Sequence, residues 1–155
     1  MAKRPTGELV AVAFGKAVLA MAGKPTVPVV TTLPAATVWA ATGALQVGGI
    51  VGTTTRDTDL RDMVVSWEGW ATRPNSDKPP WGQANELLED IRAAAFWDWA
   101  DAALPLDLEP AGVYEPVLVQ GVVPVTDPRR MADPDTSRAH YTMDLRLIWN
   151  LREDS

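Results

Sequence analysis

Strict alternation of apolar and polar residues over positions 138–150 constrains the fold of this chain more than any other feature. The polar positions of this run are interrupted only by Ile148. A repeat of two residues is typical of a β-strand with one buried face. The run therefore predicts a long strand in a sheet that is covered on one side. The residues predicted to face the core are Tyr141, Met143, Leu145, Leu147 and Trp149.

Residues 113–125 form a second apolar run, which a polar stretch, Thr126–Ser137, separates from the alternating run. We expect the two runs to pair as an antiparallel hairpin. The connection of twelve residues is far longer than the usual hairpin loop of about 2–5 residues, and long loops in compact domains are usually functional or disordered. The hairpin is therefore expected to present a charged loop as a contact surface.

Two segments have the apolar spacing of amphipathic helices. The first covers residues 7–22, with Thr6 as its N-cap and with Gly23 and Pro25 at its end. The second covers residues 79–101. The predicted buried stripe of the first helix is Val10, Ala13, Phe14, Ala17, Val18 and Met21, and that of the second is Ala84, Leu87, Leu88, Ile91, Ala94 and Ala95.

The segments between these helices are less regular. Small and β-branched side chains over 35–45 predict a weak strand, and the Gly- and Thr-rich stretch 46–62 predicts a loop. Alternation over 63–72 predicts a further strand. Together with the hairpin of 113–125 and 138–150, these elements predict a single α+β domain over residues 1–155. Its antiparallel or mixed sheet of about four strands packs against two helices, and its loops are long.

Composition argues against several classes of function. The chain has no Cys and one His, so thiolate metal sites and the usual zinc and general-base arrangements cannot form. A net charge of −6 argues against wrapping nucleic acid, because such proteins neutralise phosphates with a basic face. We expect no enzyme, no metal and no cofactor. We also expect no membrane span, because the apolar stretch Leu9–Ala22 is short and contains Lys16.

Acidic residues are concentrated between Glu86 and Glu109, where seven acids accompany one base, Arg92. One interpretation is an ordinary solvated helix face. The other is a surface on which Glu86, Glu89 and Asp90 face a lumen and repel DNA that passes through it. The sequence is compatible with both.

Three stretches carry a likeness to a known family. They are the tryptophan-containing strand Asp62–Ala71, the helix opening Trp81–Leu88, and the hairpin Gly121–Asp135 that ends in an Arg-bearing loop. Together with the order of the elements, they resemble the tail terminator family of long-tailed bacteriophages, in particular small tail-completion proteins of phages that infect actinobacteria.

The resemblance implies a small α/β subunit that forms a ring, typically of six copies, in the tail or neck of the virion. The ring would be assembled in the host cytoplasm. It would cap the tube made by the major tail tube protein and join it to the head–tail connector or stopper protein. DNA would pass through its lumen without specific binding.

For the interfaces of such a ring, we expect the arginines of the two predicted loops to matter most. A planar guanidinium makes paired bonds to carboxylates and therefore suits interfaces. The alternative for each arginine is a solvated loop side chain. The candidate subunit or tube contacts are Arg129 and Arg130, then Arg56 and Arg61, together with Asp133 and Asp135.

Other functions fit the same sequence. A head–tail adaptor or stopper would engage the portal side of the neck, and a small acidic binding module would act as a monomer. A small enzyme is disfavoured, because no nucleophile accompanies a base. Rings in solution would favour the two assembly functions over the monomeric module.

Overall fold

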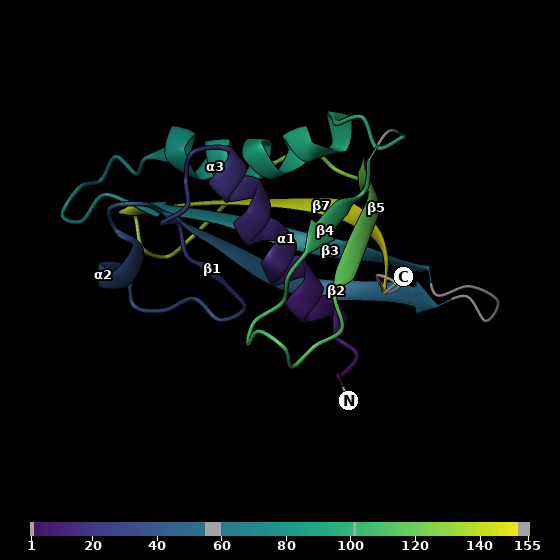
Figure 1. The fold of residues 1–155 in the computed structure, drawn as a ribbon. Coiled ribbons are helices and arrows are strands. Elements are labelled where there is room, and N and C mark those ends of the chain that lie inside the picture. The colour runs from purple at the N-terminus through teal and green to yellow at the C-terminus, as the bar shows by residue number, and fades with distance from the viewer. Residues whose placement is uncertain (1, 55–59, 101, 152–155) are drawn as a thin grey trace.

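The computed structural model describes residues 2–54, 60–100 and 102–151. Within these residues seven strands form one mixed sheet in the order β1, β2, β3, β7, β5, β4, and β6 also pairs with β7 (Figure 1). The predicted α+β class is confirmed, whereas the predicted number of about four strands is wrong. The strands are β1 (Val29–Val30), β2 (Ala44–Thr54), β3 (Arg61–Thr72), β4 (Leu104–Leu106), β5 (Val117–Pro124), β6 (Arg129–Met131) and β7 (Arg138–Leu151).

Two long helices, α1 (Gly7–Met21) and α3 (Trp81–Ala93), pack against the same sheet and share one hydrophobic core with it (Figure 1). The single-turn helix α2 (Ala36–Trp39) lies near one end of the sheet, and a short 3₁₀ helix, η1 (Ala94–Phe96), follows α3. Met143, Leu145, Leu147 and Trp149 of β7 are buried in this core, as the alternation predicts. Tyr141 is only partly buried at its margin.

The predicted hairpin of 113–125 with 138–150 is confirmed, because β5 and β7 pair antiparallel. The connection between them is shorter than the sequence predicts. The N–H groups of Val125 and Thr126 both donate to the carbonyl of Asp144, at 3.2 Å each, and β6 then pairs with residues 140–142 of β7. β6 thus continues the line of β5 along β7, with which both strands pair. Only residues 132–137 connect β6 to β7.

α1 begins and ends as predicted. Thr6 Oγ1 accepts a hydrogen bond from the N–H of Leu9 at 3.3 Å, which is the usual N-cap contact. Gly23 takes a φ of 80°, a left-handed conformation that favours glycine and ends the helix. The N–H of Lys24 then donates to the carbonyl of Leu19 at 2.8 Å, so one of the last carbonyls is satisfied.

The buried face of α1 is rotated from the predicted one. Gly15 lies on the side that approaches the sheet, and a Cβ there would lie 3.1 Å from the side chains of Leu45, Trp67 and Val29. The glycine permits this close approach, which brings its neighbours inward. Met21 is 61% exposed, and Ala13 and Ala17 are only partly buried. The buried residues are Val10, Ala11, Phe14, Gly15, Val18 and Leu19.

The predicted strand 35–45 is wrong, because residues 36–39 form α2 and β2 starts only at Ala44. Trp39 is fully buried, and its Nε1–H donates to the carbonyl of Pro34 at 3.0 Å, which closes the turn. Gly43, with a φ of 75°, then redirects the chain into β2. Alanine favours helix, so the small residues of this segment follow their local preference.

The predicted loop 46–62 is also wrong, because most of it belongs to β2 and the first residues of β3. β2 pairs antiparallel with β3 on either side of a register shift between Val47 and Ile50. Gly48 and Gly49 occupy this β-bulge, where an extra residue is accommodated. Pairing with β3 therefore overrides the weak strand preference of glycine. The strand predicted over 63–72 is confirmed and begins two residues earlier.

The helix predicted over 79–101 is shorter, since α3 starts at Trp81 and ends at Ala93. The carbonyl of Ala94 accepts hydrogen bonds from the N–H of Trp97 and from Nε1–H of Trp99, at 3.3 and 2.8 Å. These two N–H groups satisfy a carbonyl at the end of the helical segment, which would otherwise need the N–H groups of a further helical turn. Trp97 and Trp99 then stack, with ring centroids 5.7 Å apart. The predicted stripe is buried at Ala84, Leu87, Leu88, Ile91 and Ala94.

Candidate interaction surface

The second face of β3 and β7 carries polar side chains in cross-strand pairs. Ser66 Oγ donates to Asp144 Oδ1 at 2.8 Å, and Arg146 makes a two-contact ion pair with Asp62, in which Nε lies 3.1 Å from Oδ1. The hydrogen bond and the charge of Asp62 raise the pKa of Arg146 above its usual value. Such pairs hold two strands in register. We call this surface the polar face.

His140 lies in an aromatic cluster at one end of the polar face. Its ring stacks on Trp70 with centroids 3.7 Å apart, and its Nε2 lies 2.9 Å from Glu68 Oε1. Nε1–H of Trp70 donates to Gln46 Oε1 at 3.0 Å, and Trp39 of α2 lies against the same indole. Only 9% of the surface of His140 is exposed. Its contacts with Trp70 and Glu68 therefore help to hold β7 against β3.

Alternation along β6 sends its two arginines to opposite sides of the sheet. Arg130 is opposite Tyr141, and its guanidinium lies 4.1 Å from the centroid of Trp81, so it connects β6 to the start of α3. Arg129 is opposite Thr142, on the side of the polar face. It is exposed, and it takes part in none of the ion pairs formed by the described residues. Within the part of the chain that the structure describes, Arg129 has neither an ion-pair partner nor an aromatic one, whereas Arg130 has Trp81, so Arg129 is the candidate of this pair for binding a partner.

Asp133 and Asp135 shape the turn between β6 and β7. Oδ1 of Asp133 accepts from the N–H of Asp135 at 2.8 Å, and Oδ1 of Asp135 accepts from Oγ and N of Ser137 at 2.7 and 2.9 Å. The side-chain hydrogen bond from Ser137, helped by its backbone N–H, lowers the pKa of Asp135. Both acids therefore have local partners in the turn, as Asp residues before a turn often do.

Of the second pair of predicted arginines, the structure places only Arg61, and it lies far from Arg129. Arg56 lies outside the described residues. Arg61 opens β3 at the other end of the sheet, where its guanidinium lies 5.6 Å from the centroid of Trp149. Arg61 pairs with Trp149 of β7 and Arg129 pairs with Thr142, so the two are separated by roughly 20 Å along that strand.

The three predicted lumen acids differ in their surroundings. Glu86 and Asp90 both bind Lys24, which follows α1, and Nζ lies 2.8 Å from Glu86 Oε1. Burial acts to lower the pKa of Lys24, but the hydrogen bonds to Asp90 and Glu86 raise it above its usual value. Glu89 is exposed and belongs to no ion pair among the described residues. Two of the three acids thus connect α3 to α1.

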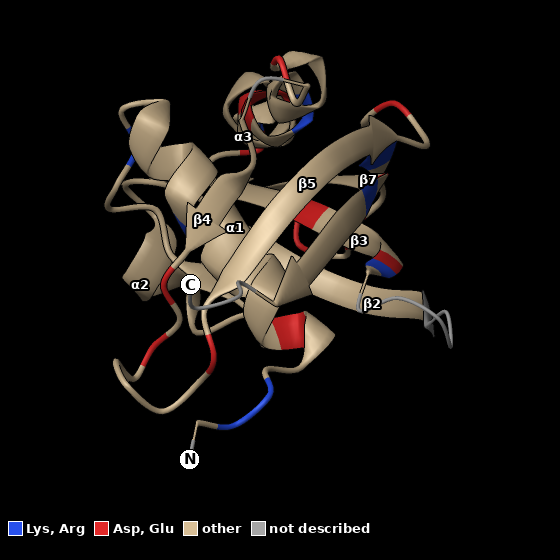
Figure 2. Cartoon of the chain, turned by 45° about the vertical axis from the view of Figure 1, so that its right-hand side comes forward, with Lys and Arg blue, Asp and Glu red and all other residues tan. Residues whose placement is uncertain are grey.

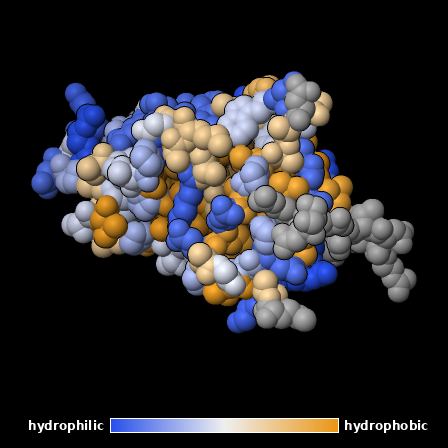
Figure 3. Space-filling view, viewed as in Figure 1, coloured by the Kyte–Doolittle hydropathy of each residue, from blue (hydrophilic) through white to orange (hydrophobic). Residues whose placement is uncertain are grey.

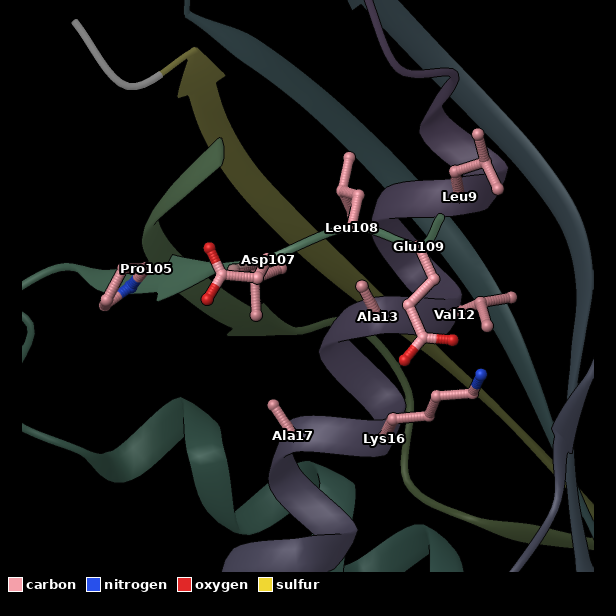
Figure 4. A pocket seen from close by; sticks show the side chains of 10 residues that line it. Leu9, Val12, Ala13, Lys16, Ala17, Pro105, Asp107, Leu108 and Glu109 are labelled. Atoms are coloured by element: carbon pink, nitrogen blue, oxygen red, sulfur yellow. The ribbon is translucent and has the colours of Figure 1, made fainter. Parts of the chain in front are cut away.

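A hollow of about 360 Å³ lies between α1 and the segment that follows β4, and sequence reasoning missed it. Leu9, Val12 and Ala13 of α1 line one wall, and Asp107 and Glu109 line the other (Figure 4). Figure 3 shows hydrophobic side chains at the surface in the middle of the molecule, where α1 lies in Figure 1. The sequence contained a signal, since α1 carries only two charged residues in fifteen and is therefore apolar nearly all round.

Other signals for a site are absent from the described ranges. Among residues 2–54, 60–100 and 102–151, no three His, Asp or Glu side chains gather as a metal-binding group. No helix within these ranges combines the length and apolar character that a membrane crossing requires. No protein-family model matches this chain, and no curated protein sequence matches it.

Proposed function

We propose that this protein is a structural subunit of a phage virion that forms a ring, with six copies, at the end of the tail tube. The ring caps the tube built by the major tail tube protein and joins it to the head–tail connector or stopper. Its subunits fold in the host cytoplasm and become part of the tail or neck of the virion. It performs this role by shape and association, without catalysis.

The main support for the proposal is that a monomer has two unlike surface patches that are exposed or only partly buried. One is Arg129 on β6, which is exposed and has no ion-pair partner among the described residues. The other is the outward apolar side of α1 with its hollow. A ring needs contacts between two different patches of each subunit, whereas a symmetric dimer uses one patch twice. The likeness of the sequence to tail terminators points to the same kind of assembly.

The polar face supplies further contacts suited to partners in a tail. Its paired charges, such as Asp62 with Arg146, are partly exposed and already held in place by each other. They would therefore lose little side-chain conformational entropy when a neighbouring protein binds them. Glu89 is the acid of α3 that would repel DNA in the lumen, because Glu86 and Asp90 are engaged by Lys24.

Assembly of tail tubes with and without this protein tests the proposal. Purified protein added to polymerising major tail tube protein should bind one end of each tube as a ring in negative-stain images. A phage that lacks the protein should make tubes of irregular, excessive length that do not join heads. Tubes of normal length in the mutant, together with heads that leak DNA, would instead identify a head–tail adaptor or stopper. Normal infectious virions would overturn both functions.

A further inference from the structure

We propose that the hollow between α1 and the segment after β4 receives β6 of a second copy of this chain, with Arg129 and Met131 as the inserted side chains. This inference rests on the proposed ring and names the contact that builds it. We call the hollow, defined by Leu9, Val12, Ala13, Asp107 and Glu109, the acceptor hollow.

The floor of the acceptor hollow is the side of α1 that the fold leaves only partly buried. The opposite side, with Phe14 and Val18, is fully packed on the sheet, whereas Leu9 and Val12 on the outer side are only partly buried. A second hollow, lined partly by Val29 and Thr31, flanks the same Leu9 and Val12. A helix that is apolar nearly all round is normally buried on every side. The outer side of α1 is therefore a surface that association would cover.

The rim of the acceptor hollow is acidic. Asp107 and Glu109 are both exposed, whereas Leu108 between them is buried. Neither acid belongs to an ion pair among the described residues, although Lys16 of α1 also lines the hollow and its side chain lies beside that of Glu109 (Figure 4). The chain has no Lys or Arg between Asp98 and Glu115, and Figure 2 shows acidic residues spaced along the segment from β4 to β5.

β6 has the complementary pattern. Arg129 and Met131 lie on the same side of an extended strand, roughly 6–7 Å apart, and both are exposed. Met131 is a flexible apolar side chain of the kind that fills irregular gaps. The segment 126–138 carries three acids and three arginines, but its acids already have partners: Asp133 and Asp135 bond within the turn, and Asp127 pairs with Arg92. A cation beside an apolar side chain matches an acidic rim around an apolar floor.

The contact must join two copies, because the two patches are far apart within one. β6 pairs with β7 around Tyr141, whereas β4 is next to the part of β5 that pairs with Trp149. The separation along β7 is roughly 20 Å or more. Each copy therefore offers β6 to one neighbour and its acceptor hollow to the other, which is the head-to-tail arrangement that closes into a ring.

Charge-reversal variants on the two sides of the proposed contact test this inference. Arg129→Glu alone and Asp107→Arg alone should each weaken self-association roughly tenfold or more, measured by mass photometry and analytical ultracentrifugation. An equimolar mixture of the two should recover assembly, because alternating copies restore an opposite-charge pair at every contact. Arg4→Glu, which changes an exposed arginine outside both patches, is the control and should assemble like the unaltered protein. Assembly of both single variants at unaltered strength would overturn the inference and leave the ring itself standing.

Disulfide trapping gives an answer even if free subunits associate weakly, since the chain has no Cys of its own. Met131→Cys and Ala13→Cys variants, carrying tags of different mass, should form a mixed disulfide dimer when oxidised together. Val38→Cys, on the exposed side of α2, is the matched control and should not form a mixed dimer with Met131→Cys above random collision. Equal yields for Ala13→Cys and Val38→Cys would reject the contact. Normal virions without the protein would instead reject the proposed function, so the two failures are distinguishable.

Discussion

Arg129 and Arg130 are neighbours with opposite environments, and the alternation of β6 is the cause. Arg130 turns toward α3 and lies over the ring of Trp81, while Arg129 turns toward the polar face and has no charged partner among the described residues. The sequence predicts both as partner contacts, because it does not reveal that a strand passes through the polar loop. One arginine therefore serves the fold, and the other is the candidate for binding.

We predict that Arg130→Ala destabilises the protein and that Arg129→Ala does not. Loss of the stacked guanidinium should lower the free energy of unfolding by about 0.5–1 kcal/mol, the usual strength of a cation–π contact at an exposed site. Arg129→Ala should stay within about 0.5 kcal/mol of the unaltered protein, as is common for surface substitutions. Urea denaturation followed by tryptophan fluorescence measures both, and equal losses would contradict the assignment.

Asp135 provides a prediction about pH. Hydrogen bonds from Ser137 lower the pKa of this carboxyl, so its charged form stabilises the turn above the unfolded pKa of about 3.9. That contribution is lost as the pH falls through the lowered folded pKa. Ser137→Ala should move the pKa of Asp135 upward toward its ordinary value. An NMR titration of the carboxyl carbons in both proteins checks this, and an unchanged pKa of Asp135 in the variant would contradict it.

At the scale of elements, the sequence predicts best where periodicity is strong. The strands over 63–72 and 138–150 and the caps Thr6 and Gly23 are confirmed, because alternation and capping act locally. The segment 46–54 is not recognisable as a strand, since its Gly and Thr content is typical of a loop and its strand state depends on pairing with β3. The rotation of α1 is equally hidden, because it follows from the close approach of Gly15 to the sheet.

Two glycines in paired strands should respond differently to alanine. A Cβ at Gly69 of β3 would lie 2.5 Å from the carbonyl oxygen of Ala84 in α3, so the helix must shift to admit it. We expect Gly69→Ala to cost about 1–3 kcal/mol, the usual penalty for overpacking. Gly49→Ala in the β2 bulge meets nothing within 4 Å and should be neutral or slightly stabilising, because it reduces the freedom of the unfolded chain. Thermal denaturation of the two variants compares them directly, and similar melting temperatures would refute the prediction.

At the scale of the whole molecule, the helices are tied to each other as well as to the sheet. Lys24 extends from the end of α1 to Glu86 and Asp90 of α3, so two elements separated by some sixty residues share one charged contact. The sequence predicts that these acids are exposed on α3 but not that a lysine binds two of them. The proposed ring and its proposed partners involve several chains, so a single sequence suggests them only through likeness to a family.

The Lys24 contact should be lost at high pH. Its pKa is raised in the folded protein, so its stabilising effect is complete below the unfolded pKa of about 10.4 and disappears as the pH rises through the folded value. Lys24→Met removes the charge and keeps most of the apolar chain. We expect the variant to be less stable than the unaltered protein at pH 8 and the difference to shrink above pH 11, as measured by urea denaturation at each pH. A constant difference across this range would show that the charge is not the cause.

The position of β3 between β2 and β7 has a consequence for biosynthesis. β2 and β3 can pair as soon as residue 72 has left the ribosome, but the second edge of β3 waits for residues 138–151, the last of the described strands. Throughout that interval an edge of twelve residues has unpaired backbone groups, which are a template for pairing with other chains. Prematurely terminated chains should therefore be prone to aggregate, and slow translation of the final third would prolong the hazard for every nascent copy.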